Sequence, residues 1–225
     1  MGDSMSEYFE GFPEEMVDFF WELRMNNNME WFKSNKKRYE DYVKKPMELF
    51  SKELCDRMNA MDIGETFTTQ ISRINRDIRF SKDKSPYRAH RWVVLKYRDG
   101  RWQENPCLYF QIGPESYSFG FGFYETNKNY LERYRKKMMA DLETIKGFEK
   151  MISEQDAFVS DVELYKKNFA PEGIDENIKK WFQFKGISFS TTSKLTPEVF
   201  NNEIVDIVEE GYKFILPMFM YFKDI

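Results

Sequence analysis

The chain has 225 residues, 41% of them hydrophobic and 18% aromatic, enough to bury a large core, and we expect residues 1–225 to form a single domain. The 32% of charged residues and the regular spacing of the apolar ones exclude a disordered or fibrous chain. The formal net charge is −4, yet residues 73–91 carry +5 and the remainder −9, a concentration that argues against general nucleic-acid binding and favours a pocket for one small anion.

The N-terminal part of the chain predicts two helices. Pro13 at a first-turn position, followed by two glutamates and an apolar face, predicts a helix over residues 13–25. Asn27 followed by Glu30 is typical of a capping box that starts a second helix. Pro46 lies inside that second helix, so we expect a kink or break just before it.

After Gly64 the sequence changes to a strand pattern. Strands are predicted over residues 67–74 and 91–97, so the basic segment between them is a connecting loop. The Asp99-Gly100 pair that follows is a strong signal for a two-residue hairpin turn. The next strand is therefore expected to pair with the one over residues 91–97.

Two further strands follow, over residues 107–112 and 117–124, with a turn at Gly113-Pro114 between them. In the second of these strands, alternation places aromatic side chains on one face, which we expect to be buried. The opposite face carries glycines, where a packed helix or a ligand is expected to approach the backbone. The residues are Phe119, Phe121 and Phe123 on the first face, and Gly120 and Gly122 on the second.

The C-terminal part returns to helical patterns. A last short strand, residues 186–190, precedes a long helix opened by Thr196-Pro197-Glu198. Helices on both sides of a run of antiparallel strands are typical of an α+β fold, here a mainly antiparallel sheet packed against several helices. The remaining predicted helices cover residues 127–139, 141–152 and 175–184.

The basic loop is the strongest candidate site. Its cationic side chains lie on a connection where the chain reverses direction, so several of them can converge on one point. Guanidinium groups donate paired hydrogen bonds in a fork that matches phosphate and carboxylate ligands. The predicted ligand is therefore a small anion. The predicted ligand-binding residues are Arg73, Arg76, Arg79, Ser81, Lys82, Lys84, Tyr87 and Arg88.

Two other interpretations of the loop stay open. In one, Asp77 and Asp83 pair with the arginines in a structural salt-bridge network that holds no ligand. In the other, the loop contacts an acidic partner as a protein-interaction module. A ligand site requires the loop to line a concave pocket, whereas an interaction module presents it on a flat or convex surface.

An enzyme acting on the anion is a further alternative. The candidate catalytic residues are Asp77 and His90, each as a proton carrier, and His90 is the only histidine of the chain. A single histidine excludes the common multi-histidine metal sites, and the neighbouring cations disfavour a divalent metal at Asp77 and Asp83. The sequence therefore predicts no metal site, and it identifies no cofactor.

The cysteines and the lengths of the apolar runs indicate the cellular compartment in which the protein is expected. Cys55 and Cys107 are far apart in sequence, which argues against a disulfide scaffold, a redox pair and a thiolate zinc site. The longest apolar run, residues 214–222, is much shorter than the ~20 residues of a membrane span, and no signal-peptide pattern is present. We therefore expect a cytoplasmic protein that does not associate with a membrane.

Four segments carry a resemblance to a known family. They are NNNMEWF at residues 26–32, RINRDIRFSKDKSPYRAH at 73–90, YFQIGPESYSFGFGFY at 109–124 and NFAPEGID at 168–175. Together they resemble the family called domain of unknown function 2461, over nearly the whole chain. Its arginine-rich core, RD-x-RFSKDK-x-PY, falls on residues 76–87. The resemblance implies no activity, cofactor or partner, and FYETN at residues 123–127 departs from the tryptophan and proline typical of the family.

Overall fold

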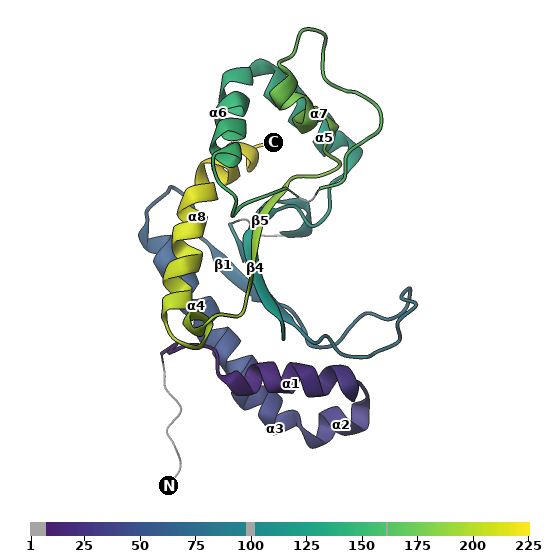
Figure 1. Cartoon of the computed structure of the whole chain (residues 1–225), viewed down its shortest axis with the longest axis vertical. Coiled ribbons are helices and arrows are strands. Elements are labelled where there is room, and N and C mark those ends of the chain that lie inside the picture. The colour runs from purple at the N-terminus through teal and green to yellow at the C-terminus, as the bar shows by residue number, and fades with distance from the viewer. Residues whose placement is uncertain (1–7, 98–101, 161) are drawn as a thin grey trace. The chain divides into compact units, whose positions relative to one another are not determined.

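The computed structural model describes residues 8–97, 102–160 and 162–225. Its strands form one five-stranded antiparallel sheet whose spatial order follows the chain order, β1-β2-β3-β4-β5 (Figure 1). Helices precede, interrupt and follow the strands, so the expected α+β fold is confirmed. The strands are β1 (Thr68–Ile71), β2 (Arg91–Lys96), β3 (Cys107–Ile112), β4 (Ser116–Gly122) and β5 (Ser188–Lys194).

Hydrogen bonds define the start of the connection between β1 and β2. The two strands are antiparallel, with Ile71 opposite Val93. Pairing continues past the end of β1, because the Ser72 N–H donates to the Trp92 carbonyl at 2.8 Å and the Trp92 N–H donates to Ser72 Oγ at 3.1 Å. The two ends of the basic loop therefore leave the sheet side by side.

The turn between β3 and β4 is the one predicted at Gly113-Pro114. The Gly113 N–H donates to the Ser116 carbonyl at 2.9 Å, which closes the hairpin. The predicted Asp99-Gly100 turn lies outside the described residues. β1 is shorter than the predicted strand over residues 67–74, whereas β3 has the predicted bounds.

The chain divides into two units, which are described separately. The first consists of Met1–Tyr97, Tyr109–Ser118 and Thr192–Gly211, and the second of Arg98–Leu108, Phe119–Thr191 and Tyr212–Ile225. The first contains α1 (Glu14–Met25), α2 (Met29–Ser34), α3 (Lys36–Tyr39), a π-helix (Glu40–Lys44) and α4 (Lys45–Ala60). The second contains α5 (Lys128–Ala140), α6 (Leu142–Ser153) and α7 (Lys179–Gln183), and α8 (Glu203–Phe222) begins in the first unit and ends in the second.

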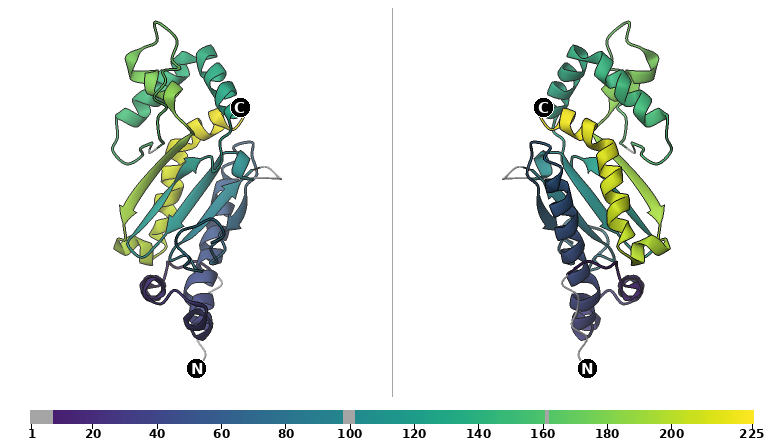
Figure 2. Two further views of the ribbon diagram at one scale, coloured as in Figure 1. Left: turned by 90° about the vertical axis from the view of Figure 1, so that its right-hand side faces the viewer. Right: turned by 90° about the vertical axis from the view of Figure 1, so that its left-hand side faces the viewer.

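Aromatic rings form the centre of the first unit. Phe50 of α4 lies 4.4 Å from Phe110 of β3 and 5.1 Å from Phe12, measured between ring centres. All three side chains are buried. Within this unit, α4 and the first turns of α8 cover the same face of the sheet (Figure 2). Burial of these rings stabilises the unit, because it removes a large apolar area from water.

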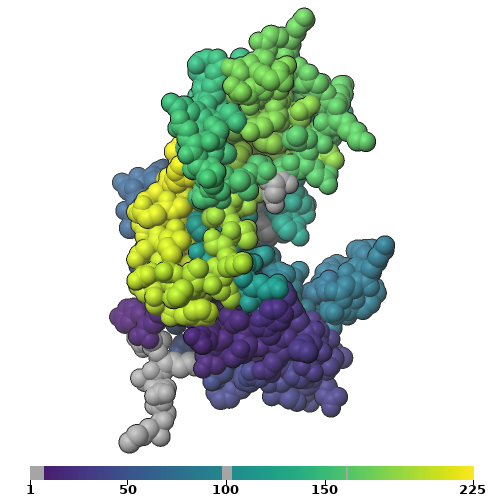
Figure 3. All heavy atoms as spheres, in the orientation of Figure 1, coloured from purple at the N-terminus to yellow at the C-terminus, as the bar shows by residue number. Residues whose placement is uncertain are grey.

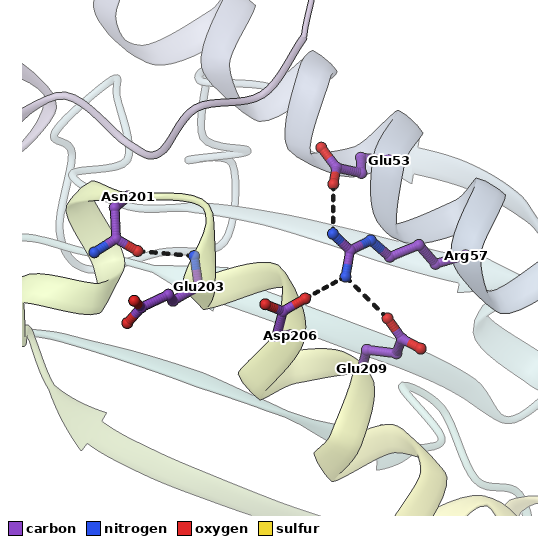
Figure 4. Close-up of polar contacts among 6 residues, drawn as sticks. All are labelled: Glu53, Arg57, Asn201, Glu203, Asp206 and Glu209. Atoms are coloured by element: carbon purple, nitrogen blue, oxygen red, sulfur yellow. Dashed lines mark hydrogen bonds and ion pairs between the residues drawn. The ribbon is translucent and has the colours of Figure 1, made fainter.

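Arg57 links α4 to the first turns of α8 (Figure 4). Its guanidinium donates to Glu53 on its own helix at 2.7 Å and to Glu209 on α8 at 3.1 Å. It also bonds Asp206, one turn earlier on α8. Because three carboxylates surround one guanidinium, the two helices depend on Arg57 to offset the repulsion among their acids.

In the second unit, β4 contributes buried aromatic side chains as predicted. Phe119 is 4% exposed and Phe121 is fully buried. Phe123 lies beyond the end of β4 and is half-buried, with its ring centre 4.3 Å from that of Tyr130 on α5. The predicted burial is therefore confirmed for the two phenylalanines inside the strand and only partial for the third.

The glycines of β4 lie against the backbone of the neighbouring strand, β5, and of the residue before it. A Cβ atom at Gly120 would be 2.1 Å from the carbonyl oxygen of Phe189 and 2.7 Å from the Cα of Ser190. At Gly122 it would be 3.0 Å from the carbonyl oxygen of Ile187. The expectation that a helix or a ligand approaches this face was wrong, because the backbone of β5 and the residue before it occupies it.

The kink or break predicted near Pro46 takes the form of a π-helical segment, through which the backbone stays helical. The α-helical hydrogen bonds of α3 give way to π-helical bonds over Glu40–Lys44. α-Helical bonds resume in α4, where Pro46 occupies the first turn. Proline has no N–H to donate to the carbonyl four residues earlier, so an uninterrupted α-helix would leave that carbonyl unpaired. The wider π turn accommodates the missing donor.

The last helix begins later than predicted. Pro197–Phe200 forms a separate 3-10 turn, and Asn201 is fully extended, which interrupts helical bonding. The side chain of Asn201 then accepts the Glu203 N–H at 2.8 Å, and α8 begins at Glu203 (Figure 4). Among the described residues, no helix combines the length and the apolar character needed to cross a membrane.

Candidate functional site

The connection between β1 and β2, residues 72–90, forms an arm that stands out from the surface of the first unit (Figure 3). Its two sides are bonded to each other like a narrow ribbon. The Arg76 N–H donates to the Pro86 carbonyl, and the Arg88 N–H donates to the Ile74 carbonyl, both at 2.8 Å. The arm is therefore an ordered element with a defined tip, residues 77–85.

Ion pairs hold the tip of the arm. Arg79 donates two hydrogen bonds to Asp77, with Nε 2.9 Å from Oδ1 and Nη2 2.6 Å from Oδ2. This pairing lowers the pKa of Asp77 to about 2. Arg76 bonds Asp83, whose Oδ1 also accepts the Ser85 N–H at 2.9 Å. Hydrogen bonds from Ser85 and Arg76 lower the pKa of Asp83 far below its usual range. Both aspartates are therefore ionised at neutral pH.

A clasp from the start of α2 anchors the arm. Asn27 Nδ2 donates to the Tyr87 carbonyl at 2.9 Å, and the Tyr87 N–H donates to Asn27 Oδ1 at 3.0 Å. The Tyr87 ring stacks on Phe32 with ring centres 4.1 Å apart. The helix cap is Asn28, which accepts the Trp31 N–H at 2.9 Å, so the predicted capping box at Asn27 was wrong by one residue. The side-chain amide of Asn27 instead both donates to and accepts from the backbone of the arm.

A pocket of about 620 Å³ lies between the arm and the end of α1. Arg24 reaches it from α1, with Nη1 3.2 Å from Glu115 Oε2. Arg88 reaches it from the arm, where its Nη1 donates to the backbone carbonyls of Asn75 and Arg73 at 2.8 and 3.1 Å. We call this hollow the arm pocket. Its lining is Arg24, Asn27, Arg76, Asp77, Ser81, Asp83, Ser85, Tyr87, Arg88, Ala89 and His90.

His90 is the titrating group of the arm pocket. Burial lowers the pKa of its imidazole below the usual value, and the guanidinium groups of Arg88, Arg24, Arg76 and Arg91 lower that pKa further. The imidazole is therefore neutral at pH 7, in a region where several positive charges converge. Such a potential attracts an anion and repels a cation.

A match to the family described as "Conserved hypothetical protein (DUF2461)" covers residues 15–221. The chain belongs to the DUF2461 family. None of the curated proteins compared with the chain matches it. The clasp joins two of the segments that carry the resemblance, since Asn27 and Phe32 lie in NNNMEWF and Tyr87 lies in the arginine-rich core.

The arm pocket collects some of the residues predicted for this DUF2461 chain and leaves others outside. Arg76, Ser81, Tyr87 and Arg88 line it, together with the catalytic candidates Asp77 and His90. Lys84 does not line it, and its Nζ donates to the Ile78 carbonyl at 3.0 Å. The tip also carries Phe80, which is 94% exposed. The other predicted residues outside the lining are Arg73, Arg79 and Lys82.

Sequence reasoning missed the residues that α1 and the clasp contribute. Arg24 lies on the polar face of an amphipathic helix, and nothing in the local pattern distinguishes it from an ordinary surface arginine. Asn27 was interpreted as a cap because its position next to a helix start explains an asparagine equally well. Only the tertiary contact with Tyr87 brings both residues to the arm.

Arg91 is a fourth arginine close to the site, at the first position of β2. It is 4% exposed, and its Nε and Nη1 atoms have no hydrogen-bond partner among the described residues. Its guanidinium carbon lies 5.8 Å from the ring centre of Tyr39. Burial lowers the pKa of Arg91, and the group adds positive potential behind His90.

Proposed function

We propose that the protein binds a small anionic molecule, phosphorylated or carboxylated, in the arm pocket. One observation carries the proposal: Arg24, Arg76 and Arg88 lie in the wall of one pocket together with a half-buried imidazole. Guanidinium groups donate paired hydrogen bonds to phosphate and carboxylate oxygens. A volume of about 620 Å³ is within the range of ligand pockets and larger than bare phosphate needs.

The charges in the wall favour an anion over a cation. Both carboxylates, Asp77 and Asp83, are already bonded to arginines of the arm. The bonds of Arg88 to backbone carbonyls involve only Nη1, so within the described part of the chain its Nε and Nη2 are available to a ligand. The exposed cations of the arm that do not line the pocket add a positive field, which raises the local concentration of anions.

An enzyme acting on the bound anion is a second candidate, which the position of His90 favours. A neutral imidazole can accept a proton from a ligand group, and His90 lines the pocket. Asp77 is a poorer proton carrier, because its pKa of about 2 keeps it ionised and Arg79 bonds both of its oxygens. If a reaction occurs, His90→Gln should slow it by about 10²- to 10⁴-fold, whereas the same change should leave simple anion binding largely intact.

The test uses the single histidine as a reporter. Because the chain has one histidine, the imidazole signals in an NMR spectrum come from His90 alone. We expect sulfate to raise the pKa of His90, since a bound dianion offsets the positive potential of the surrounding guanidinium groups. Sulfate keeps its charge through the titration range of histidine, so the shift reports binding at the pocket and not titration of the ligand.

Variants connect the shift to the pocket. Arg76→Ala and Arg88→Ala should each weaken sulfate binding by about 1.5 to 3 kcal/mol, the contribution of a hydrogen bond to a charged group. Lys52→Ala is the charge-matched control, because Lys52 is an exposed lysine of α4 that pairs with Asp56 and does not line the pocket. The proposal is wrong if saturating sulfate leaves the His90 titration unchanged, or if Lys52→Ala weakens binding as much as the arginine variants.

A further inference from the structure

We infer that the arm pocket takes a phosphate ester whose body carries hydroxyl groups, that is, a sugar or polyol phosphate. The inference rests on the proposed anion site and names the class of its ligand. It is based on the hydrogen-bond acceptors in the wall of the pocket, which a fully ionised anion such as sulfate cannot use. Hydroxyl groups are the ligand groups that match them.

The first acceptor is Asp83. Its carboxylate accepts from Arg76 at Oδ2 and from the Ser85 N–H at Oδ1. A carboxylate has about four acceptor positions, so these two donors leave about two unused. Asp77 differs, because the Arg79 N–H, Nε and Nη2 make four contacts with it, two on each of its oxygens. Of the two aspartates in the wall, only Asp83 has capacity for a ligand.

Asn27 and Ser85 provide further acceptors. Asn27 Oδ1 accepts one bond, from the Tyr87 N–H, and a second lone pair remains. The Ser85 hydroxyl oxygen, also in the lining, carries two lone pairs that can accept from a ligand. Sulfate has no donor for these atoms, and a bare phosphate offers only its own P–OH, while the charge of Asp83 repels both anions. A ligand hydroxyl bonds to the same atoms and turns this part of the wall into a favourable contact.

Two other ligand classes fit the wall less well. A ligand ammonium would also bond Asp83, but it would meet the guanidinium groups of Arg24, Arg76 and Arg88. A nucleobase binds well against an exposed aromatic face, whereas the phenol ring in the lining, Tyr87, is 8% exposed and stacked on Phe32. The combination of guanidinium donors and unused oxygen acceptors therefore favours a phosphate with a hydroxylated body.

The experiment compares two phosphate esters that differ in the body attached to phosphate, with the free sugar as a control. Methyl phosphate, ribose 5-phosphate and ribose are titrated separately into the full chain at constant pH, and the His90 imidazole signal is followed. We expect ribose 5-phosphate to bind about tenfold more tightly than methyl phosphate, the effect of one hydrogen bond from a ligand hydroxyl to the ionised carboxylate of Asp83. Ribose alone should leave the signal unchanged.

A protein variant tests whether the acceptors of the wall cause the preference for ribose 5-phosphate. Ser85→Ala removes a side-chain acceptor and keeps the backbone bond to Asp83, so it should reduce ribose 5-phosphate affinity several-fold and leave methyl phosphate affinity unchanged. Equal affinities for methyl phosphate and ribose 5-phosphate overturn the hydroxyl inference and leave the anion site standing. A signal that neither phosphate ester moves overturns both. Ribose binding as tightly as its phosphate shows that the arginines do not select the ligand, which also overturns both.

Discussion

At the level of single residues, the protonation of His90 makes the stability of the folded chain depend on pH. Its pKa in the folded chain is lowered by burial and by four arginines, Arg88, Arg24, Arg76 and Arg91. The unfolded chain therefore binds a proton at a higher pH than the folded chain does. The contribution of His90 to the free energy of unfolding is therefore fully present above its unfolded pKa of about 6.5. That contribution is lost as the pH falls from there through the folded pKa.

The corresponding prediction concerns His90→Gln, which removes the titration. Because glutamine carries no proton in either state, the variant should lose less stability than the wild type when the pH is lowered through the range below about 6.5. Urea midpoints measured at a series of pH values give this comparison. Identical pH slopes for the two proteins would show that the folded-state pKa of His90 is not lowered.

Arg91 and Arg57 give opposite predictions for the same substitution. Arg91 is buried with two nitrogens unpaired among the described residues, whereas Arg57 bonds carboxylates on α4 and α8. Arg91→Met should raise stability by about 1 to 3 kcal/mol, because methionine removes a buried charge that has two nitrogens without a partner in the described part of the chain. Arg57→Met should lower stability by a similar ~1 to 3 kcal/mol, since it leaves the carboxylates facing one another.

Thermal or urea unfolding of the two methionine variants measures both effects, and each variant serves as the control for the other. Arg91→Met has a second readout, because loss of one of the positive charges near His90 should raise the pKa of that imidazole. Destabilisation of both variants to the same extent would mean that the Arg91 guanidinium has partners that compensate for its burial.

At the level of elements, the clasp determines the position of the arm. Asn27→Ala removes two hydrogen bonds to the backbone of Tyr87 and leaves both of those backbone groups without their partner. Trypsin should then cleave the arm faster at Arg79, Lys82 or Lys84, because cleavage requires the ribbon to open. The rate of appearance of the cut chain, followed by mass spectrometry, measures this effect.

The neighbouring residue provides the control for the clasp. Asn28→Ala removes the cap of α2 and should cost about 1 kcal/mol of stability, similar to the loss of one bond in the clasp. It leaves the contact between Asn27 and Tyr87 intact, so the rate of trypsin cleavage in the arm should stay close to that of the wild type. Faster cleavage in both variants would indicate general loosening of the unit and not release of the arm.

The elements that depend on local patterns were predictable from the sequence. Alternation located β3 and β4, and Pro46 located the interruption before α4, because both signals act within a few residues. The start of α8 was placed too early, since a proline that suits a first turn also suits the short 3-10 turn that the chain forms there. Local chemistry alone does not distinguish these two outcomes.

The candidate site was predictable only in part, for a related reason. The charge of the arm is visible in the sequence, so Arg76 and Arg88 were included among the candidates. Which arginines face the pocket depends on bonds across the arm, and Arg79 is taken by Asp77 at the tip. Arg24 comes from a helix far away in sequence. Its contribution depends on packing that the spacing of residues does not encode.

At the level of the whole molecule, the chain path bears on cooperativity. β3, β4, β5 and α8 each begin in one unit and end in the other. If one unit unfolded alone, these elements would be interrupted in the middle, and backbone groups inside strands would lose their partners. That cost opposes independent unfolding, and it supports the prediction that residues 1–225 behave as a single domain.

We therefore predict one cooperative unfolding transition. Differential scanning calorimetry should give a single peak whose calorimetric and van't Hoff enthalpies agree. Arg57→Met tests the same point more sharply, because Arg57 and its partners all lie in the first unit. In a cooperative molecule this substitution moves the entire peak to lower temperature. In a molecule whose units unfold independently it moves only part of the heat absorption and splits the peak, an outcome that would contradict the single-domain interpretation.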